Sequence, residues 1–229
     1  MSDALDTLAA WGRARRPARV LDLATGDARA ALAFVPIART LTVYDSLPVL
    51  TTARARLTGA GPSANVRYAA GEAVALPFAD EVFDLVTCRL AAHRFAEPAA
   101  TLREVRRVLR PGGALLLHDL RGHDEAETNA LVRTLKARHD PRYVRAYRTA
   151  EWKAFLRAAG LTVMEESTAT AVHAWNDFTE GLTPETTRDL ERMLREAPER
   201  VRRALDVRLD GNAIESFAEP TLLVRAERD

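Results

Sequence analysis

The chain has a single cysteine, only two lysines and no long apolar run. Because Cys88 has no second cysteine to join, an intramolecular disulfide and a cysteine-based zinc site are both excluded. Cys88 lies in the apolar run 83–88, where a free cysteine is expected to be a small core residue. No stretch of 18 apolar residues exists, so no transmembrane helix is expected. The first residues also lack the basic and apolar segments of a secretion leader, which favours a cytoplasmic protein.

The charged residues nearly balance. Lysine and arginine number 33 and the acidic residues 32, a net charge of +1 that gives no reason to expect nucleic acid or a membrane surface as partner. Hydrophobic residues make up 47% and charged residues 28%, as in ordinary globular proteins. A chain of 229 residues is most simply one domain with a substantial core. The sequence leaves the oligomeric state open, a homodimer included.

Short apolar runs alternate with helical patterns along the chain. This alternation predicts a doubly wound α/β fold, in which helices cover both faces of a mostly parallel sheet. Strands are expected at about 19–24, 40–45, 65–69, 83–88, 114–120, 161–168 and 221–226. The stretch 171–215 has helical spacing and high charge, and we expect it to form a helical lid or insertion before the last strand.

The strongest local signal is the segment 19–33, ARVLDLATGDARAAL. An apolar run containing Asp22 breaks at a turn with Gly26 and then resumes as a helical pattern, which predicts a strand–loop–helix unit. Such a unit presents backbone N–H groups and a helix N-terminus to a ligand. Asp45 ends the next apolar run, where a second parallel strand would bring a carboxylate to ribose hydroxyls. Together these features predict a nucleoside-type cofactor.

The order of these and later segments resembles class I S-adenosylmethionine-dependent methyltransferases of type 11, in particular the ubiquinone and menaquinone biosynthesis C-methyltransferases. The resemblance implies a Rossmann-like, seven-stranded sheet with an antiparallel last strand, and S-adenosylmethionine lying over the carboxyl ends of the first strands. It also implies methyl transfer to a small organic acceptor, with residues 17–168 as the cofactor-binding core. The matching segments are VLDLATG (20–26), Asp45, AAGEAVALPFADEVFDLVTCRLAAHRF (69–95), LREVRRVLRPGGALLLHDL (102–120) and DPRYVRAYRTAEWKAFLRAAGLTV (140–163).

The resemblance implies roles for residues that hold the donor. Asp22 would face the ammonium group of the donor, Gly26 would let the backbone approach it, and Asp45 would accept hydrogen bonds from the ribose hydroxyls. Glu72 would lie near the adenine amino group. For each, an ordinary loop-bracing, turn or solvated role is the alternative. The implied cofactor-binding set is Asp22, Ala24, Gly26, Asp45, Ser46, Gly71, Glu72, Ala73 and Arg89.

Three basic residues near the implied reaction centre have more than one reading. Arg89 could pair with the carboxylate of the donor or with an anionic acceptor, or it could brace a loop acid such as Asp27. His93 matches the first member of a His-His pair in the resembling branch, and it is the first candidate to orient or deprotonate the acceptor. A loop histidine bonded to backbone is an equal alternative. His118 is the second candidate base.

No metal site is expected. His118 and Asp119 are adjacent in the sequence, but neighbouring residues of a strand face opposite sides of the sheet. The pair therefore resembles a set of metal ligands only superficially.

The loop departs from the pattern of the resembling family, which has glycines at alternate positions. Here alanine stands at 24 and 28, which would cost about 1 kcal/mol at a position that needs positive φ. Asp27 would also repel the donor carboxylate unless an arginine such as Arg29 or Arg89 intervenes. These departures motivate an alternative: a degenerate methyltransferase fold that binds or assembles without catalysis. A nicotinamide-dependent oxidoreductase fits less well, because the third glycine of that motif is missing.

Overall fold

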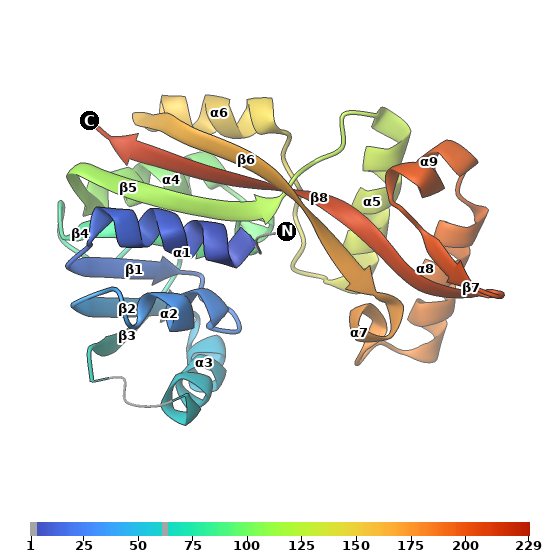
Figure 1. Cartoon of the computed structure of the whole chain (residues 1–229), viewed down its shortest axis with the longest axis horizontal. Helices are drawn as coiled ribbons and strands as arrows, with labels where there is room; N and C mark the ends of the chain where they lie inside the picture. The colour runs from blue at the N-terminus through green and yellow to red at the C-terminus, as the bar shows by residue number, and fades with distance from the viewer. Residues whose placement is uncertain (1–3, 61–63) are drawn as a thin grey trace.

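A computed structural model describes residues 4–60 and 64–229. Within them, eight strands form one mixed sheet, in the order β3-β2-β1-β4-β5-β8-β6 with β7 paired to β8 (Figure 1). The first five strands run parallel, and β8 runs antiparallel to both β5 and β6. The strands are β1 Arg19–Leu23, β2 Thr40–Asp45, β3 Val66–Ala70, β4 Phe83–Arg89, β5 Leu109–Leu120, β6 Leu161–Ala174, β7 Arg208–Asp210 and β8 Ala213–Arg228. The predicted doubly wound fold is confirmed, including the antiparallel strand between β5 and β6.

Helices cover both faces of the sheet, and each face has its own apolar cluster. On one face, α1 (Ala4–Arg15), α2 (Arg29–Phe34) and α3 (Leu47–Gly59) pack over alternate strand residues such as Val20 and Leu116. On the other, α4 (Pro98–Val108) and α6 (Thr149–Ala158) pack over Leu21 and Leu117. Because both faces are covered, the central strands are almost continuously apolar, as parallel strands usually are. The buried Cys88 belongs to the second cluster, as expected of a core cysteine.

A third apolar cluster lies beyond the carboxyl ends of the parallel strands. There β6 and β8 extend past the sheet as a two-stranded ribbon, surrounded by helices (Figure 1). We call this part the outer lobe: α5 (Ala126–His139), α7 (Trp175–Thr179), α8 (Pro184–Glu196), α9 (Glu199–Ala204), β7 and the outer halves of β6 and β8. Its core includes Leu135, Phe178, Leu190 and Phe217. Among the described residues, no helix is long and apolar enough to span a membrane.

The ribbon is the main difference from the predicted elements. The expected strands 161–168 and 221–226 are the inner halves of much longer strands, and β7 was not predicted. Pro220 explains why the strand 221–226 was predicted too short, because a proline usually marks the end of a strand. In the structure Pro220 directly precedes Thr221, the first β8 residue that pairs with β5. The N–H that proline lacks therefore costs no hydrogen bond to β5. Within 171–215, helices occupy 175–204, and strands lead into and out of them.

Candidate functional site

The carboxyl ends of β1, β2 and β4 bring Asp22, Asp45 and Arg89 together. Asp22 pairs in register with residues of both neighbouring strands, and strand alternation turns it toward the face that α1–α3 cover. Asp22 is buried, and Thr25 Oγ1 donates a hydrogen bond of 2.5 Å to its Oδ2. Burial raises the pKa of the Asp22 carboxyl to about 7, with a further contribution from the charge of Asp45, while the charge of Arg89 acts in the opposite sense.

The loop between β1 and α2 takes a left-handed backbone conformation at every second residue. The φ angles are +54° at Ala24, +53° at Gly26 and +60° at Ala28. Both alanines are therefore strained, by about 1 kcal/mol each relative to glycine. Their methyl groups, however, do not fill a ligand space, because Ala24 packs against one core cluster and Ala28 is buried in the other. A Cβ added at Gly26 would have no atom within 4 Å.

Asp45 fixes this loop from the adjacent strand. Its Oδ2 accepts a hydrogen bond of 3.0 Å from the Gly26 N–H, and its Oδ1 accepts one of 2.7 Å from the Ser46 N–H. A carboxylate offers about four lone-pair positions, so each oxygen can still accept a further bond from a ligand hydroxyl. The side chain is partly exposed, which leaves it accessible to such a ligand.

Asp27 is neutralised by arginines other than Arg89. Its Oδ2 lies 2.8 Å from Nε of Arg29 and 3.7 Å from a nitrogen of Arg56. This removes the repulsion that an isolated Asp27 would exert on a donor carboxylate. Arg89 is therefore not among the arginines that pair with Asp27.

Gly71 and Glu72 follow β3 beside this loop. The Gly71 N–H donates to the Asp45 carbonyl at 3.3 Å, and the Tyr44 hydroxyl donates to the Glu72 carbonyl at 3.1 Å. A Cβ at Gly71 would come within 2.3 Å of the Tyr44 hydroxyl oxygen, so a larger residue there would have to displace the Tyr44 side chain. The Glu72 side chain is exposed and Ala73 packs against the core, which leaves the acid facing solvent at the edge of the site.

His93 forms a buried pair with an acid that the sequence analysis did not assign to it. The Nδ1 atom of His93, in the short helix η1 (Ala92–Arg94), lies 2.6 Å from Oδ1 of Asp119 at the end of β5. The His93 backbone N–H donates to Oδ2 of the same carboxylate at 3.0 Å. Burial alone would raise the pKa of the Asp119 carboxyl, but the His93 ring and these hydrogen bonds hold it below its ordinary value. An Nδ1 proton held by Asp119 leaves Nε2 able to accept a proton.

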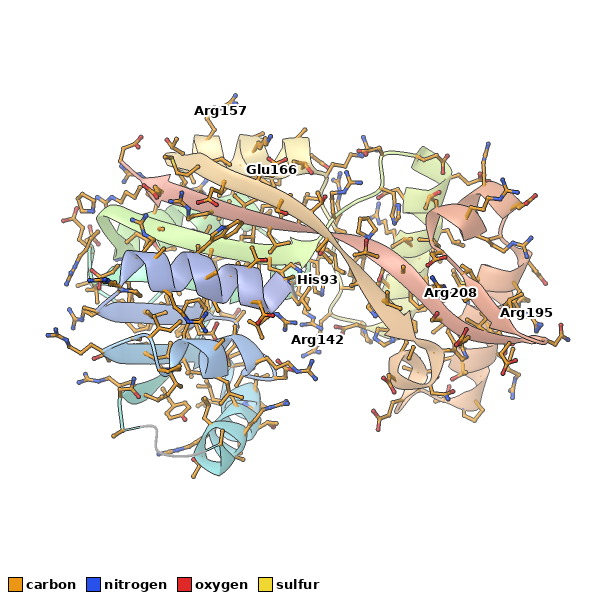
Figure 2. The ribbon with its side chains drawn as sticks, viewed as in Figure 1. His93, Arg142, Arg157, Glu166, Arg195 and Arg208 are labelled. Atoms are coloured by element: carbon orange, nitrogen blue, oxygen red, sulfur yellow. The ribbon has the colours of Figure 1, made fainter. Side chains whose placement is uncertain are left out.

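Tyr143 lies beside this pair, with its ring 5.8 Å from the His93 ring. The His93 carbonyl also accepts hydrogen bonds from the N–H groups of Val144 and Arg145, which fixes the loop after α5 against η1. Figure 2 shows His93 and Arg142 near the junction of the sheet with the outer lobe in this view. Tyr143 was also missed from the sequence, because only the folded chain brings residue 143 to residue 93.

His118 lies apart from His93. It is buried on β5 in register with Arg89, and its carbonyl accepts a hydrogen bond of 2.7 Å from the Leu90 N–H. Strand alternation puts His118 on the α1–α3 face with Arg89, whereas Asp119 points to the opposite face. The two candidate bases therefore lie on different sides of the sheet. Within the described residues, no three histidine, cysteine or acidic side chains are grouped as a metal ion requires.

The residues at the carboxyl edge fit a cationic ligand with a vicinal diol. Asp22 is a buried carboxylate without an ion-pair partner in the described chain, and the space beside Gly26 is open. Asp45 provides two oxygens with remaining acceptor capacity at the neighbouring strand end. S-adenosylmethionine carries an ammonium group, a sulfonium and a ribose diol, so these residues match the ligand that the resemblance implies.

The chain is similar to known methyltransferases in sequence and in fold. Residues 21–117 match the model of a methyltransferase domain family. The uncharacterized methyltransferase YcgJ of Bacillus subtilis is 33% identical over 158 residues, which cover 69% of this chain and 60% of that protein. The demethylmenaquinone methyltransferase of Mycobacterium tuberculosis is 37% identical over 131 residues, 54% of this chain and 51% of that protein. The chain thus spans about half to three fifths of these curated relatives.

The solved structure of YcgJ supports the same assignment over nearly the whole chain. It superimposes with a TM-score of 0.91 and 27% sequence identity, covering 98% of this chain and 97% of that one. The agreement therefore includes the outer lobe as well as the residues that match the family model. From its matched domain, its relatives and its fold, the chain belongs to the class I S-adenosylmethionine-dependent methyltransferases.

Proposed function

We propose that this chain transfers a methyl group from S-adenosylmethionine to a small organic acceptor. The observation that carries the proposal is the donor loop, residues 24–28. Its alternating left-handed residues are held by Asp45, and its alanine methyl groups point into the two cores rather than toward Gly26. Two strained alanines beside the buried Asp22 carboxylate support a role for this loop in ligand binding.

The donor, when bound, supplies an electrophilic methyl group on a positively charged sulfur. The residues of the chain have to hold it and align the acceptor, and such positioning contributes on the order of 7–11 kcal/mol in favourable cases. In this proposal, Asp22 attracts the cationic end, Asp45 accepts hydrogen bonds from the ribose hydroxyls, and Arg89 pairs with the donor carboxylate. Gly71, Glu72 and Ala73 line the adenine side.

His93 is the proposed base for an acceptor that must lose a proton. Its Nδ1 is oriented by Asp119, so Nε2 is the atom that receives the proton while the acceptor atom bonds to the methyl group. The outer lobe would close over the acceptor as a lid, since η1 and the loop 140–148 lie at its junction with the sheet. Support for a small organic acceptor comes from the name of the mycobacterial relative, whose acceptor is demethylmenaquinone.

The proposal is tested with a donor that carries an isotopically labelled methyl group. Purified protein is incubated with this donor and a cell extract separated into small molecules, proteins and nucleic acids. We expect label in the small-molecule fraction, together with one equivalent of S-adenosylhomocysteine per methyl transferred. Label only in protein or nucleic acid would contradict the small acceptor, and no transfer to any fraction would contradict the activity.

The His93→Asn variant separates binding from chemistry in the same assay. General-base assistance is typically worth about 10²–10⁴ in rate, so turnover should fall within that range while donor affinity stays unchanged. Asp119→Asn should lower turnover too, because the His93 ring then loses the carboxylate that fixes its proton on Nδ1. Unchanged turnover in both variants would exclude His93 as the base.

A further inference from the structure

A hollow in the described structure lies away from the donor loop. It has a volume of about 560 Å³ and sits between the turn that joins α1 to β1 and the turn that joins α2 to β2. Both turns precede parallel strands, so the hollow is at the amino edge of the sheet, opposite to the carboxyl edge where Asp22 and Asp45 lie. Its volume is within the range of small-molecule sites.

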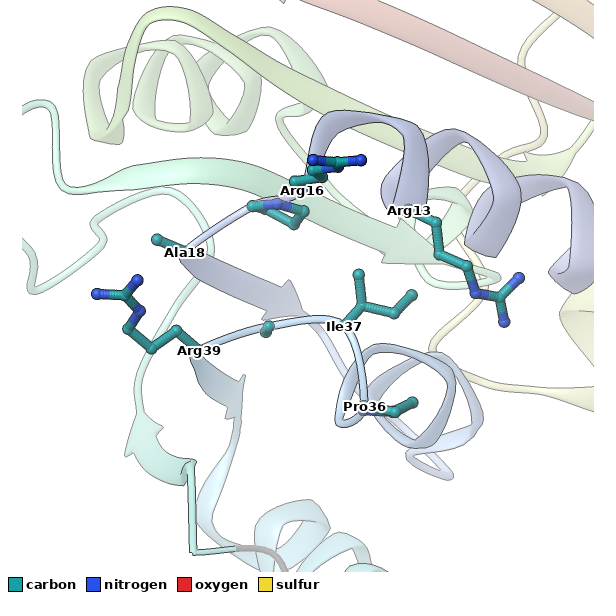
Figure 3. Close-up of a pocket in the computed structure, with 8 residues that line it drawn as sticks. Arg13, Arg16, Ala18, Pro36, Ile37 and Arg39 are labelled. Carbon is teal, nitrogen blue, oxygen red and sulfur yellow. The ribbon is translucent and has the colours of Figure 1, made fainter.

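Three arginines border this hollow, and the lining includes no acidic residue. Arg13, Arg16 and Arg39 share the lining with the apolar residues Pro17, Pro36 and Ile37, which we call the apolar floor. Figure 3 shows Arg13 on the last turn of α1 and Arg16 and Arg39 on the two connecting turns, with side chains that point in different directions. The guanidinium groups therefore stand apart instead of meeting at one point. We call these three residues the arginine rim.

The arginine rim has no counter-charge in the described chain. None of the three side chains takes part in an ion pair there, whereas most other arginines do. Two acids lie at the same edge, but both are already occupied. Asp84 accepts from the backbone N–H groups of residues 18 and 19 and pairs with Arg110, and Glu227 pairs with Arg15 and Arg225.

The partial charge at a helix end explains the position of two of the three rim arginines, but not of the third. The carboxyl terminus of α1 carries partial negative charge, which attracts Arg13 and Arg16. Arg39 is different, because it directly precedes β2 and lies four residues beyond the C-cap of α2 at Val35. An excess of cations on a chain with a net charge of only +1 makes this edge locally positive and attractive to anions.

We propose that this hollow binds a small organic molecule bearing a chain of phosphates. Guanidinium groups form paired, charge-assisted hydrogen bonds with phosphate oxygens. Because the rim groups stand apart, an extended chain of phosphates can reach more than one of them, which a single phosphate cannot. The apolar floor would take the organic part. No aromatic side chain lines the hollow, so the stacking platform that single-stranded nucleic acids use is missing here.

The experiment is calorimetric titration of the full chain with inorganic triphosphate and with ATP, each in the presence of saturating S-adenosylmethionine. The donor keeps ATP from binding through its adenosine at the carboxyl edge. The rim variant is Arg13→Gln/Arg16→Gln/Arg39→Gln. The matched control is Arg103→Gln/Arg157→Gln/Arg188→Gln, three exposed arginines that likewise lack ion pairs in the described chain and whose loss changes the net charge equally.

We expect both probes to bind the wild type, and the rim variant to bind about tenfold or more weakly, as the loss of charge-assisted contacts requires. The control should stay within about twofold of the wild type. The single variant Arg39→Gln should also weaken binding. It leaves Arg16, which has a positive φ in the turn after α1, unchanged. No binding by the wild type, or equal losses in rim and control variants, would overturn the proposal. Tighter binding of polyglutamate or DNA than of ATP, in the same titration, would also overturn it.

Discussion

At the scale of single residues, the site combines one strained loop with one buried acid. The loop keeps alternating left-handed residues although two of them are alanines, and each alanine recovers part of that cost by burying its methyl group in a core. Asp22 is buried with a hydroxyl from Thr25 as its side-chain partner. Both features become understandable when a cationic ligand completes the site.

Asp22 makes the affinity for the donor depend on pH. Because burial raises its pKa to about 7, the carboxyl is mostly neutral at pH 6 and mostly ionised at pH 8. The ionised form attracts the positive donor, so donor affinity should rise between pH 6 and pH 8. Calorimetric titration across this range should show the rise in the wild type and a flat profile in Asp22→Asn. A flat wild-type profile would contradict this role.

The raised pKa of Asp22 should make donor binding strongest at high pH, but it lowers the stability of the fold there. The folded chain holds the Asp22 proton up to about pH 7, whereas the unfolded chain releases it near pH 4, so the shift destabilises the fold as pH rises between these values. Above pH 7 the loss reaches about 4 kcal/mol at most. Denaturant unfolding should therefore find Asp22→Asn more stable than the wild type at pH 8, with little difference at pH 4.

Replacing Gly26 with alanine should abolish donor binding while changing the stability of the fold only slightly. The Gly26→Ala change adds strain of about 1 kcal/mol at positive φ, a cost that positions 24 and 28 already show to be tolerable. The new methyl group would, however, project into the open space beside the loop, where the donor is expected. We expect a small fall in unfolding free energy and a loss of donor binding by calorimetry. Ala24→Gly is the control and should keep binding.

At the scale of elements, the outer lobe has a buried ion pair that holds α5 against the ribbon of β6 and β8. Lys136 of α5 contacts Glu219 of β8, and His173 of β6 lies 2.9 Å from the same carboxylate. The Lys136 ammonium is also 5.1 Å from the Phe178 ring and 5.9 Å from the Phe217 ring. Burial would raise the pKa of the Glu219 carboxyl, but Lys136 and His173 lower it to about 2.

Breaking this pair should destabilise the protein strongly. In Glu219→Gln, the Lys136 charge stays buried without its partner, which typically costs about 3–5 kcal/mol. The double variant Lys136→Met/Glu219→Gln should recover most of that loss, because no charge then remains unpaired. Denaturant unfolding at pH 7 measures both variants. Asp189→Asn, in an exposed pair with Arg138, is the control and should cost about 1 kcal/mol or less.

The pH dependence of the pair follows from the lowered pKa. The contribution of the pair to the free energy of unfolding is complete above the ordinary glutamate pKa near 4.5. It is lost as the pH falls toward 2. The stability difference between the wild type and Glu219→Gln should therefore shrink in this acid range. A constant difference would show that Glu219 does not act through its charge.

The helices and strands also show which parts of the fold can be predicted from the sequence. Strands β1–β4 were predicted within two residues, because apolar runs bounded by turns mark buried strands clearly. The outer halves of β6 and β8 were missed, since each is stabilised by pairing with the other and Pro220 imitates a strand end. The pairing of His93 with Asp119 was missed for a similar reason. Two residues 26 positions apart meet only because the carboxyl ends of β4 and β5 are neighbours.

At the scale of the whole molecule, the two edges of the sheet carry different charges and different chemistry. The carboxyl edge carries Asp22 and Asp45, the residues that we propose hold the cationic donor, and the amino edge carries the arginine rim. The net charge of +1 conceals this separation, so composition alone gave no reason to expect an anionic ligand. The outer lobe adds a core of its own at the carboxyl edge, next to His93, where an acceptor would be enclosed.

The proposed methyl transfer requires that S-adenosylmethionine binds at the loop that Asp45 fixes. Calorimetric titration with S-adenosylmethionine tests this binding directly. The wild type should bind one donor per chain. Asp45→Asn should bind it about tenfold or more weakly, because hydrogen bonds to a charged acceptor are worth about 1.5–3 kcal/mol. No heat at millimolar donor, or equal affinity in Asp45→Asn, would contradict the account.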